Sequence, residues 1–277
     1  MLCTRPSTIS VLTNDFDENG YRIRKTFTVG CGHCPACKKL KASQWSLRLI
    51  LESFDWQDVS CLTLTYDEEK IPENGSLVVK DVQDWLKRFR KRSGLTLKYY
   101  LCGEYGDDSD RPHYHAILFG VPASDEMRKL VYETWNKGIT ELKILRDERF
   151  IRYVAGYVQK KLYDDDANIK YTLMHRIPPF TLQSKGLGVG YLERHSKDLY
   201  ERLAIRFHGS DYALPRYFRK KLGVESDRIG VIVKNNEQEL LQEFYDRYGN
   251  TNEAIHRLWL SREQYALNIS AKRRNKC

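Results

Sequence analysis

The sequence predicts an α+β fold, because strand patterns and helix patterns occur together in the central part of the chain. Apolar residues alternate with threonines in CLTLTYD, residues 61–67, and an apolar run follows a turn-rich stretch at residues 116–119. Residues 124–135 and 149–163 have the pattern of helices, the first with Ser124 as its N-cap. With 277 residues, the chain is long enough to bury one or two cores.

Two histidines mark the most informative segment, residues 102–120. His113 and His115 are two residues apart in a predicted strand, so both imidazoles point to one face. Residues 98–104 are predicted to form the partner strand of a hairpin, with Glu104 near the facing position. These three side chains are candidate ligands of one divalent ion. For the histidine pair alone, ordinary strand histidines that face solvent or bond within a core are the alternative.

The predicted helix at residues 149–163 carries a pair of tyrosines. Tyr153 and Tyr157 are four residues apart and share a face, Lys161 continues that face, and Lys160 lies beside it. Small or apolar neighbours let such a helix approach a sheet closely. A tyrosine pair on a helix usually packs in a core or an interface, but its position after the histidine pair makes the combination specific.

Three cysteines have the C-x2-C-x2-C spacing at Cys31, Cys34 and Cys37, just before a helix predicted over residues 38–53. In a cytosolic chain this spacing favours metal ligation over disulfides. A structural zinc site needs four ligands, and a β-ribbon over residues 11–29 would bring Cys3 back as the fourth. His33 is the second candidate for that position. Iron–sulfur ligation and reduced thiols at a helix start are the alternatives.

The chain carries a formal net charge of +9, which favours a polyanionic partner. A helix predicted over residues 81–92, capped by Asp81, carries candidate phosphate contacts; the alternative is a solvated face whose cations stabilise the helix C-terminus. These candidate DNA-binding residues are Lys87, Arg88, Arg90, Lys91 and Arg92. A second basic cluster, AKRRNK, occupies residues 271–276. No stretch of 18 apolar residues and no signal-peptide pattern is present, so we expect the protein in the cytoplasm.

Three segments together resemble the HUH endonucleases, replication initiators that nick single-stranded DNA with an active-site tyrosine. They are CLTLTYD (61–67), GEYGDDSDRPHYHAILFG (103–120) and YVAGYVQKKL (153–162). The similarity is strongest to initiators of the microviruses, small circular single-stranded DNA phages, and especially to the gokushovirus type. It extends to CGHCPACKKLKASQWSLRLILE and, more weakly, to FTLQSKGLGVGY (180–191), and covers roughly residues 1–220. Tyr114 occupies the variable hydrophobic position between the histidines.

The resemblance implies a central antiparallel sheet with flanking helices, in which the histidine strand is central and the tyrosine helix lies across the sheet over the metal. It also implies rolling-circle replication by nicking and ligation, in which Tyr153 and Tyr157 alternately form a covalent 5′-phosphotyrosine link to DNA. A single nucleophilic tyrosine is the alternative. Mg²⁺ or Mn²⁺ on the ligands would polarise the scissile phosphate, and Lys161 or Lys160 would stabilise charge there.

We expect three regions: a β-ribbon, cysteine cluster and helix at residues 1–60, the endonuclease core at 61–200, and a basic region at 201–277 whose pattern is that of helices. The expected partners are phage origin DNA and the helicase and polymerase of the bacterial host, since no phosphate-binding loop of an unwinding motor is present. Two other function classes stay open: a zinc-containing DNA-binding protein without catalysis, and a zinc-dependent hydrolase that activates water.

Overall fold

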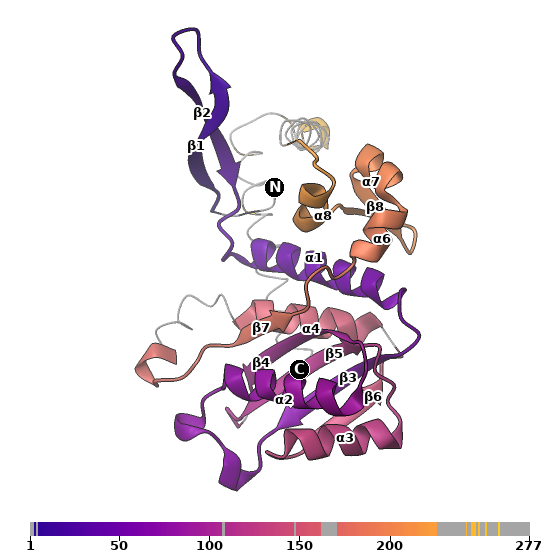
Figure 1. Cartoon of the computed structure of the whole chain (residues 1–277). Helices are drawn as coiled ribbons and strands as arrows, with labels where there is room; N and C mark the ends of the chain where they lie inside the picture. The colour runs from indigo at the N-terminus through magenta and orange to yellow at the C-terminus, as the bar shows by residue number, and fades with distance from the viewer. Residues whose placement is uncertain are drawn as a thin grey trace. The chain divides into compact units, whose positions relative to one another are not determined.

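The computed structural model describes residues 3, 5–106, 109–146, 148–161 and 171–225, with positions 242, 245–247, 249, 253 and 260; in the helix at 148–161 the side chains of 153 and 157–161 lie outside this description. Contacts divide the chain into one unit of residues 1–40 with 224–277 and another of residues 41–223. Figure 1 gives the element labels. Among the described residues, no helix is long and apolar enough to cross a membrane.

The described part of the first unit is a ribbon followed by the start of a helix. Strands β1 (Ser7–Phe16) and β2 (Arg22–Val29) pair antiparallel, as the sequence predicts, and nearly all of their side chains are exposed. Helix α1 (Pro35–Ser53) follows and continues into the second unit. It begins at Pro35, three residues earlier than predicted, because proline lacks the N–H that would be unsatisfied at the first helical position.

The second unit is built on a five-stranded antiparallel sheet with the order β6-β3-β5-β4-β7. Its strands are β3 (Val59–Thr65), β4 (Lys98–Tyr105), β5 (Pro112–Phe119), β6 (Thr140–Ile144) and β7 (Phe180–Gln183). The strand with both histidines, β5, is the middle strand, so the predicted α+β class and the central position of that strand are confirmed.

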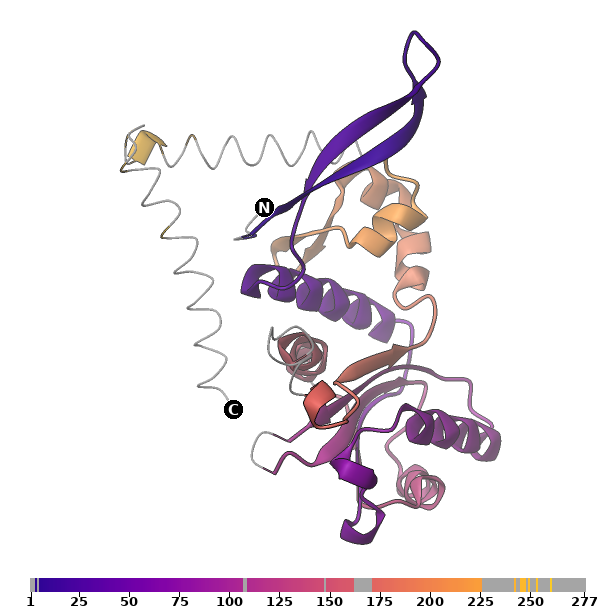
Figure 2. The ribbon, with the colours of Figure 1, turned by 90° about the vertical axis from the view of Figure 1, so that its left-hand side faces the viewer.

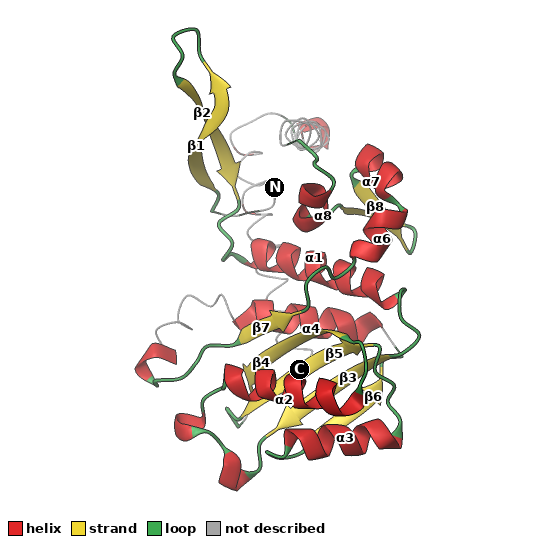
Figure 3. Cartoon of the chain, viewed as in Figure 1, coloured by secondary structure: helices red, strands yellow, loops and turns green. Residues whose placement is uncertain are grey.

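Helices cover both faces of this sheet, and each face has its own core (Figures 2 and 3). On one face, α2 (Val79–Ser93) and α3 (Asp125–Trp135) pack through Trp85, Phe89 and Trp135. On the other, α1 and α4 (Glu148–Lys161) pack on residues of β4 and β5. Two short 3-10 helices, Glu68–Lys70 and Glu73–Gly75, lie between β3 and α2.

A buried carboxylate ties α1 to its neighbours. Glu52 is fully buried; it forms an ion pair with Lys98 of β4 at 2.8 Å and accepts hydrogen bonds from Trp56 Nε1 and the Gly188 backbone N–H. Because all these partners are present, the charge is accommodated without the penalty of an unpaired buried ion. The carboxylate therefore fixes α1 against the sheet and against the segment before α6.

The end of the second unit packs on the side of α1 that carries Leu47 and Leu51. It consists of α6 (Val189–Arg194), α7 (Ser196–Arg202), β8 (Ala204–Phe207), β9 (Ser210–Ala213) and α8 (Arg216–Lys221). The β8–β9 hairpin contradicts the helical expectation for residues 204–213. Its turn, His208-Gly209, has positive φ at both positions, which is the conformation of tight hairpin turns.

Two local predictions near the sheet differ in outcome. Ser124 caps α3, since its side chain accepts from the Met127 backbone N–H. Asp81 does not cap α2; that helix begins at Val79, with Val78 as an N-cap that makes no side-chain bond. The Asp81 carboxylate is engaged elsewhere, because it accepts the Tyr66 hydroxyl at 2.8 Å and pairs with Lys137 at 3.3 Å.

Candidate active site

The pairing of β4 with β5 brings together the three predicted metal ligands. Glu104 is the register partner of His113, and His115 lies on the same face two residues further along β5. Glu104 Oε1 lies 3.0 Å from His113 Nε2 and 3.2 Å from His115 Nε2. One donor atom from each of the three residues falls within 4.8 Å of the other two. The predicted register is thus confirmed, while metal binding stays a prediction.

The outer nitrogen of each imidazole has a partner that orients the ring. His113 Nδ1 lies 3.0 Å from the Arg111 backbone oxygen, which can only accept, so Nδ1 donates there and Nε2 is the ring nitrogen that faces Glu104. His115 Nδ1 lies 3.0 Å from Thr63 Oγ1, on the neighbouring strand β3. Such bonds are the usual way in which histidine ligands of metals are held and tuned.

The Glu104 carboxylate is suited to a cation. It is 1% exposed, and its second oxygen, Oε2, is buried without a hydrogen-bond partner among the described residues. A buried acceptor of this kind costs free energy unless a ligand satisfies it. Burial by itself raises the pKa of Glu104, but the hydrogen bonds from His113 and His115 outweigh it, so that the pKa is lowered. The mixed oxygen and nitrogen donors therefore fit a divalent ion such as Mn²⁺ or Mg²⁺.

Helix α4 packs on the same sheet face as these ligands. Its Ile151, Val154 and Ala155 are buried against Cys102 and Ile117, and Cys102 is the register partner of His115. The predicted helix is thus confirmed over residues 149–161, as is its position on the histidine face, while residues 162–163 lie outside the described residues. Tyr153, Tyr157, Lys160 and Lys161 belong to this helix, but their side chains lie outside the described residues.

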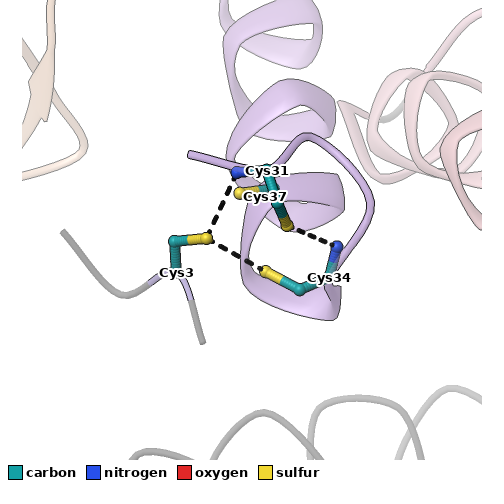
Figure 4. Close-up of side chains that lie close together, drawn as sticks. All are labelled: Cys3, Cys31, Cys34 and Cys37. Carbon is teal, nitrogen blue, oxygen red and sulfur yellow. Dashed lines mark hydrogen bonds between the residues drawn. The ribbon is translucent and has the colours of Figure 1, made fainter. Parts of the chain in front are cut away.

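The four predicted cysteine ligands also converge. The Sγ atoms of Cys3, Cys31, Cys34 and Cys37 lie within 4.8 Å of one another (Figure 4). All four belong to the first unit. Two further cysteines lie in the sheet, outside this cluster: Cys102 is buried, whereas Cys61 is only half-buried.

The basic residues predicted on α2 are not brought to the histidine face, because α2 covers the opposite face of the sheet. Their side chains are exposed, but several bond within the protein: Lys87 pairs with Asp84, Arg88 donates to the Thr134 carbonyl, Arg90 donates to the Leu97 carbonyl, and Arg92 pairs with Glu133. Their role in DNA binding stays a prediction.

A second basic surface was missed at the level of sequence. Helix α8 carries Arg216, Arg219, Lys220 and Lys221, and none of them has an acidic partner among the described residues. Burial, and then the charge of Arg216, lower the pKa of the half-buried Arg219, whose Nε is buried with no hydrogen-bond partner in the described part of the chain. The run RYFRKK was visible in the sequence, but its lack of acidic partners depends on the fold.

Comparisons with known proteins find similarity to replication-associated proteins of phages. Residues 59–162 match the family model of the replication-associated protein ORF2. The chain is 28% identical over 246 residues to the replication-associated protein VP4 of Bdellovibrio phage phiMH2K, covering 79% of this chain and 76% of the relative. It is 29% identical to the replication-associated protein ORF4 of Chlamydia phage 1, over 75% of this chain and 57% of the relative.

A third relative is the replication-associated protein ORF2 of Spiroplasma virus 4, with 24% identity over 74% of this chain and 72% of the relative. No solved structure matches the chain. The matched family region runs from β3 to α4 and so contains all three candidate metal ligands and the tyrosine helix. The similarity therefore concerns the part of the chain that holds the candidate active site.

Proposed function

We propose that this phage replication initiator is an HUH endonuclease that nicks single-stranded origin DNA and rejoins it, with a tyrosine of α4 as nucleophile and a divalent ion on Glu104, His113 and His115. The observation that carries the proposal is the convergence of these donors within 4.8 Å on the sheet face where α4 packs. The similarity to phage replication-associated proteins supports the substrate class.

The reaction is a transesterification at phosphorus. The tyrosine hydroxyl attacks the scissile phosphate, a new tyrosine O–P bond forms, and the bond from phosphorus to the 3′ oxygen breaks. The proton lost by the phenol is balanced by the one that the 3′ oxygen gains. Because the phosphotyrosine is still a phosphodiester, a later hydroxyl can rejoin the strand without ATP.

A divalent cation held by the three ligands would supply positive charge that polarises a non-bridging phosphate oxygen. The contacts of the three ligand side chains orient their donor atoms for such an ion. Arg111 and Thr63 orient the two imidazoles, and burial of Glu104 keeps water away from the carboxylate. Preorganised groups of this kind need little rearrangement during the reaction.

We further propose that Tyr153 and Tyr157 act alternately. The helical bounds of α4 support this, since residues four apart in a helix share a face. In a rolling-circle reaction, the second tyrosine would cut the regenerated origin while the first is still joined to DNA. Lys161 or Lys160 would stabilise the charge that develops.

Incubation with a labelled single-stranded origin oligonucleotide and Mn²⁺, followed by a denaturing gel, tests the proposal. Wild-type protein should form a covalent adduct, and His113→Ala and His115→Ala should not. Manganese titration calorimetry, which does not depend on cleavage, should show weaker binding for both variants. The matched control is His195→Ala, an exposed histidine on the far side of α1.

The tyrosines are tested in the same assay. Each single change, Tyr153→Phe or Tyr157→Phe, should still form an adduct on the oligonucleotide, and the double variant should form none. On circular origin DNA, each single variant should also fail to release closed circles over repeated rounds. Tyr132→Phe, an exposed helical tyrosine of α3, is the control. Cleavage without any adduct would instead indicate a hydrolase that activates water, and DNA binding without cleavage would indicate a non-catalytic protein.

Nonspecific DNA affinity in this proposal comes from cations that have no acidic partner in the described part of the protein. The cations of α8 meet this condition best, and those of α2 are the second set. Changing Arg216 and Lys220 to glutamine should lower the slope of log K against log salt by about 1.4 for single strands, about 0.7 for each lost phosphate contact. The matched change of Lys87 and Lys91 on α2 should have less effect. An equal effect of both pairs would place α2 in the interface as well.

A further inference from the structure

The four cysteines of the first unit come together because the ribbon folds back on itself. In the register of β1 and β2, Ser7 is opposite Val29. Cys3 comes four residues before Ser7 and Cys31 two residues after Val29, and the Cys31 N–H reaches Cys3 Sγ. Gly32, with φ of +81°, lets the chain turn there so that Cys31 and Cys34 face the same point. Cys37 follows in the first turn of α1.

The backbone around the cysteines donates to sulfur. The Cys31 N–H donates to Cys3 Sγ, and the Cys34 N–H donates to Cys31 Sγ, each at 3.3 Å (Figure 4). Donors of this kind stabilise negative charge on sulfur, because a hydrogen bond to the charged form favours that form. None of the four sulfurs is in a disulfide.

The spacing of the sulfurs fits one metal ion. In a tetrahedral site with Zn–S bonds of about 2.3 Å, neighbouring sulfurs are separated by about 3.8 Å. The Sγ atoms of Cys34 and Cys3 are 3.8 Å apart, and all four lie within 4.8 Å of one another. This space is too small for an iron–sulfur cluster, whose several iron and sulfide ions would lie between the thiolates.

We propose that Cys3, Cys31, Cys34 and Cys37 bind one structural Zn²⁺ that closes the base of the ribbon onto the start of α1. Four thiolates leave no open coordination position, so the site has no part in catalysis. The ribbon needs stabilisation from outside its own strands, because it is two-stranded and its side chains are almost all exposed. Such a hairpin is marginally stable alone. Metal binding supplies folding free energy to a region that lacks a core.

The test is the metal content and thermal behaviour of the full-length protein. Protein exchanged into metal-free buffer should retain about one zinc per chain and no iron by elemental analysis. Reconstitution of chelator-stripped protein with Co²⁺ should give the visible absorption of a tetrahedral thiolate site. Cys3→Ser should lower the zinc content, whereas Cys61→Ser, which changes a half-buried cysteine outside the cluster, should leave it at the wild-type value.

A second measurement tests the proposed role and does not require a variant to fold. Removal of zinc by a strong chelator should speed tryptic cleavage at the basic residues of β2, Arg22, Arg24 and Lys25, and addition of Zn²⁺ should restore protection. Protein without zinc, or with iron instead, would overturn the proposal, as would equal protection with and without chelator. None of these readouts depends on DNA cleavage, so they can fail while the proposed nicking activity holds.

Discussion

The hydroxyl of Tyr114 is expected to contribute about 2 kcal/mol to the stability of the sheet. Tyr114 lies between the two histidines on β5, but its side chain is fully buried on the opposite face. Its hydroxyl accepts from the Val78 N–H at 2.9 Å and lies 2.8 Å from the Tyr66 hydroxyl. Since Tyr66 donates its single proton to Asp81, the Tyr114 proton is available to the Tyr66 oxygen and to the Val78 carbonyl, which lies 3.2 Å away.

Tyr114→Phe keeps the ring and removes these bonds. A buried N–H left without an acceptor costs about 1–3 kcal/mol, and a lost neutral hydrogen bond about 0.5–1.5 kcal/mol. Val78 is only half-buried, so water partly replaces its lost acceptor and the lower part of the summed range, about 2 kcal/mol, applies. With a urea m-value of about 2 kcal/mol per M, the unfolding midpoint should fall by about 1 M.

Urea titration followed by tryptophan fluorescence measures this change, because the ring of Trp135 lies 5.8 Å from that of Tyr114. Tyr132→Phe is the matched control, since Tyr132 is 61% exposed and should shift the midpoint little. A loss below about 0.5 kcal/mol for Tyr114→Phe, equal to the scatter expected for surface changes, would refute the assignment of this hydroxyl as a structural anchor.

The remaining predictions concern metal affinity, pH and backbone. Thr63→Val should weaken Mn²⁺ binding about 10- to 100-fold in calorimetry by freeing the His115 ring, and Thr63→Ser should restore it. Burial raises the pKa of Tyr114 to about 12, above the unfolded value of about 10. The stability that the protonated hydroxyl contributes to the fold is therefore complete below pH 10 and is lost as pH rises toward 12. Melting temperatures at about pH 9 and about pH 11 should differ more for wild type than for Tyr114→Phe. Gly138→Ala should lower the melting temperature, because a Cβ there would lie 2.4 Å from backbone atoms at the end of β3, while Gly156→Ala in α4 meets nothing within 4 Å and should not lower it.

The ligand geometry could be predicted because it depends on short-range rules. Two residues two apart in a strand share a face whatever the rest of the chain does. The facing position of Glu104 needs only one short turn between β4 and β5. The cysteine cluster was predictable for the same reason, since a single hairpin brings Cys3 to the C-x2-C-x2-C turn.

The predictions from sequence that proved wrong concern segments whose structure depends on tertiary contacts. Asp81 has the residue type of a helix cap, but Tyr66 and Lys137, distant in sequence, bind its carboxylate, and α2 begins before it. The β8–β9 hairpin has strands of only four residues, too short for a clear alternating pattern, and its apolar Ile205 is buried by packing against α1.

Which cations are available to a ligand also depends on the fold. Arg88 and Arg92 of α2 look as free in the sequence as Arg216 and Arg219 of α8. In the fold, α3 provides a backbone carbonyl for Arg88 and a carboxylate for Arg92. No acidic residue in the described part of the chain does the same for the two arginines of α8. Charge counting along the sequence cannot distinguish these cases.

The central position of β5 has a consequence for local opening of the protein. Edge strands such as β6 and β7 exchange their amide hydrogens through small fluctuations, whereas a middle strand is released only when both neighbours separate from it. His113 and His115 are on that middle strand, and Glu104 is on β4, which pairs on both sides. The amide of His115 should therefore be among the slowest to exchange, whereas Glu104 lies just beyond the pairing of β4 with β7, which ends at Gly103, and His113 is in the last pair of β5 with β3. Under the proposed function, the edge strands β6 and β7 can move as a DNA strand binds and leaves, while His115 stays held between β3 and β4.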